Sequence, residues 1–203
     1  MIKFKSINLK FNGKIIFENF SLEISKGEKF AIVGESGKGK STLFNLILGF
    51  ILPDSGEILI DNIRLNLETV NSLRRKIAWL PQNPSIIGRG IVRDEIKFIL
   101  SFEANKKINN YKLESEFEKL NLNKELLDTN FTELSGGEKQ RVGIIITKLL
   151  DRDIILLDEP TSALDENNID SVINYLYSMK DKTIVSASHD ENWLKFCENI
   201  QHI

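Results

Sequence analysis

Residues 34–42 carry a dense set of groups that can bind an anion. Gly34, Gly39, Lys40 and Ser41 satisfy the pattern G-x-x-x-x-G-K-[ST], in which a glycine-rich turn directs backbone N–H groups at phosphate oxygens. The lysine would reach the β- and γ-phosphates of a nucleotide, and the serine hydroxyl would hold Mg²⁺. The alternative is a glycine-rich turn that binds nothing. A strand-like run before the loop and a helical pattern after it favour the phosphate site.

Two acidic residues follow an aliphatic run later in the chain. Asp158 and Glu159 come directly after residues 154–157, which are all Ile or Leu. Such a run predicts a buried strand, and ligands of open α/β sheets gather where parallel strands end. Asp158 would serve the Mg²⁺ shell, and Glu159 would orient or deprotonate the water that attacks a γ-phosphate. A lone acidic pair is often only a solvated strand end, but that interpretation is weak beside a complete phosphate loop.

A third motif lies between the other two. Ser135, Gly136 and Gly137, within a Leu-Ser-Gly-Gly-Glu segment, offer a hydroxyl, backbone N–H groups and room for close approach. The sequence therefore predicts a second anion-binding surface in the same chain.

The three motifs, in this order, resemble the ATP-binding cassette (ABC) family, and the resemblance extends from about Phe11 to His189. It implies that Gln82 contacts Mg²⁺ or water, that His189 contacts the γ-phosphate and that residues 162–165 form the D-loop. Phe11 occupies the place of the aromatic that stacks on adenine, with ordinary core packing as the alternative. The resemblance implies catalytic roles for Glu159, His189 and Gln82, metal contacts from Ser41, Gln82 and Asp158, and ATP contacts from Phe11, Gly34, Ser36, Gly37, Lys38, Gly39, Lys40, Ser41, Thr42, Ser135, Gly136 and Gly137.

The same resemblance implies partners. In the family two cassettes pack head to tail, so Ser135 and Gly137 of one chain would complete the ATP site of the other. We expect ATP and Mg²⁺, a second cassette (a homodimer in the ATP state) and a transmembrane permease subunit. The chain would then be cytoplasmic and peripheral on the inner face of the cell membrane. Lys38 departs from the family, where a small residue is common, and either meets phosphate or the partner or points to water.

Hydrophobic periodicity predicts strands that alternate with helices. Together with the phosphate loop, the resemblance implies an α/β fold with the parallel sheet of a P-loop NTPase core. Alternating residues at the start of the chain, with an Asn12-Gly13 turn, predict an N-terminal antiparallel β subdomain. Helical spacing predicts an α-helical subdomain, at about residues 91–137, inserted in the ATP-binding core. We expect a single nucleotide-binding domain over residues 1–203. The chain ends soon after Gln201, so no C-terminal regulatory domain is expected.

Composition narrows the function classes. A net charge of -2 gives no reason to expect nucleic acid as a partner, and the run Arg74, Arg75 and Lys76 is interpreted as a solvated helix face. The single cysteine excludes an intrachain disulfide and favours a reducing compartment. No run approaches the roughly 20 apolar residues that span a bilayer, so a separate subunit would have to do so.

Three functions stay open. The first is an ATPase subunit of a transporter, with a weaker resemblance to the small ATP-binding subunits of bacterial iron or metal exporters. The second is a soluble ABC ATPase that drives assembly, as in iron–sulfur scaffold systems. The third is a nucleotide-gated module without turnover, which the presence of both Glu159 and His189 disfavours.

Overall fold

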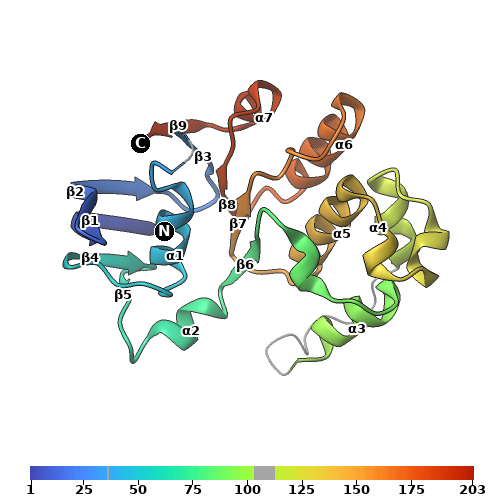
Figure 1. Ribbon diagram of the computed structural model, residues 1–203, viewed down its shortest axis with the longest axis horizontal. Helices are drawn as coiled ribbons and strands as arrows, with labels where there is room; N and C mark the ends of the chain where they lie inside the picture. Colours follow the sequence, from blue (N-terminus) through green and yellow to red (C-terminus); the bar gives the residue numbers. More distant parts are fainter. Residues whose placement is uncertain (36, 103–112) are drawn as a thin grey trace.

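The computed structural model describes residues 1–35, 37–102 and 113–203. An antiparallel sheet lies at one end of the molecule, a parallel sheet at its centre and a group of helices at the other end (Figure 1). The strands are β1 (Ile2–Phe11), β2 (Lys14–Ile24), β3 (Lys29–Val33), β4 (Ser55–Ile60), β5 (Ile63–Arg64), β6 (Ile77–Leu80), β7 (Ile154–Asp158), β8 (Thr183–Ala187) and β9 (Asn199–His202). The α-helices are α1 (Lys40–Ile47), α2 (Val70–Arg74), α3 (Val92–Ser101), α4 (Leu113–Lys119), α5 (Gly136–Leu149), α6 (Glu166–Tyr177) and α7 (Glu191–Phe196), and the short 3₁₀ helices are η1 (Pro84–Ile87), η3 (Lys124–Asp128) and η4 (Phe131–Glu133).

The antiparallel sheet has the strand order β2-β1-β4-β5. Its first hairpin turns at Asn12 and Gly13, whose φ angles of 49° and 79° suit a tight turn between right-twisted strands. Phe11 and Lys14 are the last paired residues before that turn. This sheet is the predicted N-terminal β subdomain.

The parallel sheet has the order β6-β7-β8-β3-β9, and its neighbouring strands all pair in parallel. The phosphate-loop strand β3 and the acidic strand β7 both pair with β8, so β8 separates them. Asp158 and Ile32 are both in register with Ala187. The register therefore brings the phosphate loop and the acidic strand end to one edge of the sheet.

Alternate residues of the parallel strands enter two different cores. On β7, Ile154 and Leu156 join the core toward α1 and the antiparallel sheet, whereas Ile155 and Leu157 join the core toward the helices. A parallel strand that is covered on both faces has a continuous aliphatic sequence, as residues 154–157 have. Both cores thus hold β7 in place, and with it the two carboxylates at its end.

The inserted helical region comprises α3, α4, η3 and η4 and leads into α5. Arg93 of α3 ties these elements together through ion pairs with Glu114 (2.9 Å) and Asp128 (3.1 Å). The Asn-rich segment at residues 105–110, within the predicted helical subdomain, lies outside the described residues. The region matches the predicted helical subdomain in type, and α5 carries it back to the core.

Some local interpretations were incomplete or wrong. The short elements β5, α2, α7 and β9 were not predicted from the sequence. The basic run at residues 74–76 is not simply a solvated face, because Arg74 donates to the carbonyls of Leu48 and Gly49. Lys76 in turn pairs with Asp61 at 2.5 Å.

Candidate functional site

A cavity of about 770 Å³ opens at the carboxyl edge of the parallel sheet. Its walls come from the loop after β3, the start of α1 and the ends of β6, β7, β8 and β9. This is where open α/β sheets bind ligands. The lining residues are Val33, Gly34, Glu35, Gly37, Gly39, Lys40, Ser41, Thr42, Gln82, Asp158, Glu159, Ser162, His189 and His202.

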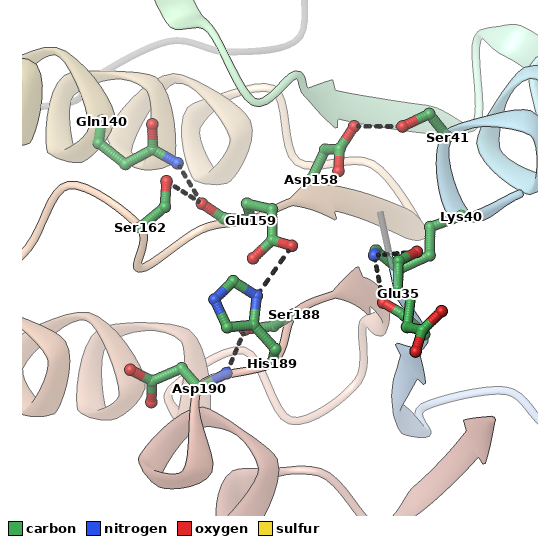
Figure 2. Close-up of polar contacts among 11 residues, drawn as sticks. Glu35, Lys40, Ser41, Gln140, Asp158, Glu159, Ser162, Ser188, His189 and Asp190 are labelled. Carbon is green, nitrogen blue, oxygen red and sulfur yellow. Dashed lines mark hydrogen bonds and ion pairs between the residues drawn. The ribbon is translucent and has the colours of Figure 1, made fainter. Parts of the chain in front are cut away.

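The phosphate loop forms one wall of this cavity. Gly37 and Gly39 have φ angles of 80° and 112°, a region that side-chain-bearing residues rarely adopt. The Lys40 ammonium folds back onto the loop and donates to the carbonyls of Gly34 (2.5 Å) and Glu35 (3.2 Å) (Figure 2). The loop thus holds its lysine over the floor of the cavity, where an anionic phosphate would meet it.

Ser41 and Asp158 face each other across the cavity floor. The Ser41 hydroxyl donates to Asp158 Oδ2 at 3.4 Å (Figure 2). Burial raises the pKa of Asp158, while the Ser41 hydroxyl opposes that shift. A hydroxyl and a carboxylate are hard oxygen ligands of the kind Mg²⁺ takes alongside phosphate oxygens and water, so these side chains fit that ion.

Glu159 and His189 form the opposite side of the cavity. His189 Nδ1 lies 3.2 Å from Glu159 Oε1, and the imidazole side chain is 76% exposed while the carboxylate is 11% exposed (Figure 2). Glu159 has a φ of 50°, unusual for a residue with a long side chain. Unfavourable backbone of this kind clusters at active sites, where the surroundings hold it.

Other predicted contacts lie at the edge of the cavity or beyond it. Phe11 is 59% exposed at the hairpin end, so the alternative of ordinary core packing is wrong, and it is not among the described residues that line the cavity. Lys38 is also absent from that lining; its ammonium points to Glu35 at 3.9 Å, and its side chain is 56% exposed. Ser36 lies outside the described residues.

The Leu-Ser-Gly-Gly-Glu segment at residues 134–138, here called the signature segment, lies apart from this chain's own phosphate loop. Ser135, Gly136 and Gly137 begin α5 and are not among the described residues that line the cavity. Gly137 packs against the D-loop, where a Cβ would stand 2.7 Å from the carbonyl oxygen of Ala163. Of the two segments predicted to bind anions, only the phosphate loop is among the described residues that line the cavity.

Sequence reasoning missed two kinds of contributor. Gln140 donates to the backbone carbonyl of Glu159 at 3.3 Å, the same carbonyl that accepts from Ser162 Oγ of the predicted D-loop at 3.1 Å. Gln140 lies two residues beyond the Leu-Ser-Gly-Gly-Glu segment, but no local pattern shows that its side chain is buried. His202 lines the cavity because β9 pairs with β3 and places it beside Val33, a register that only the tertiary structure reveals.

Comparison with known proteins agrees with this geometry. The family profile described as ABC transporter matches residues 17–162, which is more than half of the chain. The chain belongs to the ABC transporter family.

The named relatives of this ABC cassette are transport proteins. It is 33% identical to the ergothioneine transport ATP-binding protein EgtV of Helicobacter pylori (strain G27), over 94% of this chain and 91% of that protein. It is 35% identical to the energy-coupling factor transporter ATP-binding protein EcfA1 of Mycoplasmopsis synoviae (strain 53), over 94% and 74%. The names of these relatives do not favour the alternative function, a soluble ATPase that drives assembly.

Solved structures place the cassette among ABC ATPases. It matches the dimeric, post-hydrolysis state of the cassette MJ0796 bound to ADP and Pi with a TM-score of 0.85 and 29% identity, covering 100% of this chain and 94% of that one. It matches cbiO1 of Clostridium perfringens, part of the transporter complex cbiONQ, with a TM-score of 0.82 and 27% identity, covering 99% and 83%. The P-loop NTPase fold predicted from the sequence is confirmed. Within the described parts of the chain, no helix is long and apolar enough to cross a membrane.

Proposed function

We propose that this cassette hydrolyses ATP to ADP and phosphate and thereby powers a transporter through a separate membrane subunit. The observation that supports this most directly is the convergence of Lys40, Ser41, Asp158, Glu159 and His189 on one cavity. The transport names of EgtV and EcfA1 support the membrane coupling. The chain would then act in the cytoplasm, at the inner face of the membrane, through that subunit.

The first wall of the cavity would bind the triphosphate. The start of α1 carries backbone N–H groups without a side-chain cap, which is a favourable place for an anion. The Lys40 ammonium would exchange its two loop carbonyls for β- and γ-phosphate oxygens. Gly37 and Gly39 would let the backbone approach those oxygens closely, and Thr42 lines the same wall.

The floor of the cavity would hold the metal. Ser41 and Asp158 would be its protein ligands, with the Gln82 side chain at the cavity wall as a further oxygen donor. Mg²⁺ bound there supplies positive charge that neutralises the β- and γ-phosphates. Burial disfavours a lone charge on Asp158, and a cation partner would offset that cost.

Glu159 would position and deprotonate the attacking water. Its carboxylate faces the cavity and contacts the His189 imidazole, which would contact a γ-phosphate. A proton taken from water by Glu159 would leave hydroxide in line with the phosphorus, and the β-phosphate oxygen would depart with the bonding electrons.

The signature segment would complete the site of a second cassette. Ser135 and Gly136 are exposed, and neither is among the described residues that line this chain's own cavity. Two chains packed head to tail would each supply the Ser135 hydroxyl and the nearby N–H groups to the other chain's γ-phosphate. ATP would thereby become part of the dimer interface, and its hydrolysis would release that interface.

The substitution Glu159→Gln tests the hydrolytic part of the proposal. We expect the wild-type chain to release phosphate from ATP and the variant to do so at least about 100-fold more slowly, because an amide accepts a proton poorly. ATP binding should persist, so ATP-bound dimers should accumulate in size-exclusion chromatography. Glu118→Gln, on an exposed site of α4, is the matched control and should behave as wild type. Unchanged phosphate release in Glu159→Gln would place the base elsewhere.

A further inference from the structure

Gln140 connects the signature helix to the chain's own catalytic strand. Its side chain is buried, with 1% of the residue exposed, and its amide nitrogen donates to the Glu159 carbonyl (Figure 2). It lies on α5, one turn beyond Gly137. A buried amide in this position is costly unless it is hydrogen-bonded, which makes the contact with Glu159 a specific one.

The backbone of Glu159 is held from several directions. Its N–H donates to the Ala187 carbonyl at 2.8 Å, while its carbonyl accepts from Gln140, from the Ser162 hydroxyl and from the Ser162 N–H at 3.3 Å. These bonds fix both peptide planes around a residue with a φ of 50°. A left-handed conformation costs a long side chain on the order of 1 kcal/mol and persists where its surroundings hold it. The direction of the Glu159 carboxylate therefore depends on what holds its carbonyl.

Helix α5 is itself firmly anchored, so Gln140 is a fixed donor. The neighbouring Arg141 donates to the Leu120 carbonyl at 3.0 Å and to Asn168 Oδ1 at 2.6 Å. Farther along, Gly143 lies so close to Leu80 that a Cβ there would overlap the leucine side chain. Because its helix cannot shift easily, the Gln140 amide presents its hydrogen bond at a set position.

We infer that Gln140 is a positioning residue for Glu159. It acts through the Glu159 backbone carbonyl, sets the direction of the catalytic carboxylate and ties the start of α5, which serves the partner's site, to the chain's own site. The inference rests on the proposed function, because it assigns Glu159 as the base. Gln140 itself is not among the described residues that line the cavity.

The substitution Gln140→Met keeps the length and apolar bulk of the side chain but removes the donor. We expect kcat to fall about tenfold while KM and the Kd for ATP change less than about twofold, because misplacing a catalytic group affects the chemical step and not binding. ATP-bound dimers should then persist about tenfold longer, as in a mild form of Glu159→Gln. A residue of purely structural importance would alter KM and dimerisation along with kcat.

Two further variants sharpen the test. Gln140→Asn keeps the amide but withdraws it by one methylene, so it should show the same kcat loss, and it replaces Gln140→Met if that variant does not fold. Thr147→Val is the matched control, since it removes a buried hydroxyl on the same helix that, within the described parts of the chain, donates to the Ile144 carbonyl of α5 itself. It should retain wild-type kcat.

The kinetics of the Glu159 and Gln140 variants distinguish a failure of the positioning role from a failure of the proposed function. If Glu159→Gln abolishes hydrolysis but both Gln140 variants keep kcat within twofold of wild type, the positioning role is wrong and the proposed function stands. A kcat loss accompanied by an equal rise in KM also overturns the positioning role. If Glu159→Gln hydrolyses ATP as wild type does, the proposed function itself fails.

Discussion

The starts of α1 and α5 are both predicted to bind anions, yet they are built differently. The α1 start is preceded by Gly39 in a left-handed conformation, has no side-chain cap and has no acidic residue in its first turn. The α5 start is closed by a capping box, in which Ser135 Oγ accepts from the Glu138 N–H (3.3 Å) and Glu138 Oε2 accepts from the Ser135 N–H (2.7 Å). The N–H groups at the α1 start have no side-chain cap, whereas the α5 start caps its own N–H groups.

The difference explains why one end would bind a phosphate alone and the other would not. At α1 the free N–H groups, the helix dipole and Lys40 all favour an anion. At α5 the Glu138 carboxylate already interacts with the dipole, which leaves the Ser135 hydroxyl proton and the glycine N–H groups as donors. An end that carries its own negative charge is a weak receptor for free phosphate. It is better suited to contact a phosphate that a second chain presents.

Removing the charge at the α1 start should give the largest effect. Lys40→Ala should weaken ATP binding by roughly 100-fold, because charge-assisted hydrogen bonds to phosphate contribute on the order of 1.5–3 kcal/mol. Titration with a fluorescent ATP analogue measures this, with thermal unfolding to verify the fold. An affinity within a few-fold of wild type would show that the open helix end, without the lysine, carries the binding.

The two signature glycines should respond differently to the same added methyl group. A Cβ on Gly137 would lie 2.7 Å from the Ala163 carbonyl oxygen, whereas one on Gly136 would meet only the Ala163 side chain at an ordinary 3.6 Å. Gly137→Ala should therefore lower the free energy of unfolding by about 1–3 kcal/mol, since the D-loop backbone must move.

Gly136→Ala is the matched control and should change stability by less than about 0.5 kcal/mol. Urea denaturation of the monomer without ATP measures both variants. Equal stability losses would mean that the α5 start does not pack on the D-loop as closely as the structure shows.

Local sequence patterns predicted the strands and loops that carry the site better than they predicted the contacts that tertiary packing adds to it. The aliphatic run before Asp158 and the glycine-rich loop after β3 each specify their own conformation, so both were located from the sequence. The left-handed backbone of Glu159 was not, because no glycine marks it and the surrounding hydrogen bonds produce it. The Gln140 contact and the position of His202 likewise depend on how α5 and β9 pack, which local sequence does not encode.

Lys38 gives the smallest expected effect, because it lies in the phosphate loop but is not among the described residues that line the cavity. Its ammonium is 3.9 Å from the largely exposed Glu35 carboxylate, a separation at which a surface pair contributes about 0–1 kcal/mol. Lys38→Ala should therefore change ATP binding by the monomer less than about twofold. We expect ATP-driven dimerisation to weaken about fivefold, since a second chain packed over the loop would meet this exposed cation. Higher ionic strength should reduce that difference.

Lys26→Ala, at an exposed turn before β3, is the control and should alter neither ATP binding nor dimerisation. Equal effects of Lys38→Ala on the two equilibria, measured by titration and by size-exclusion chromatography, would mean that the lysine belongs to the phosphate site and not to the face that receives the second chain.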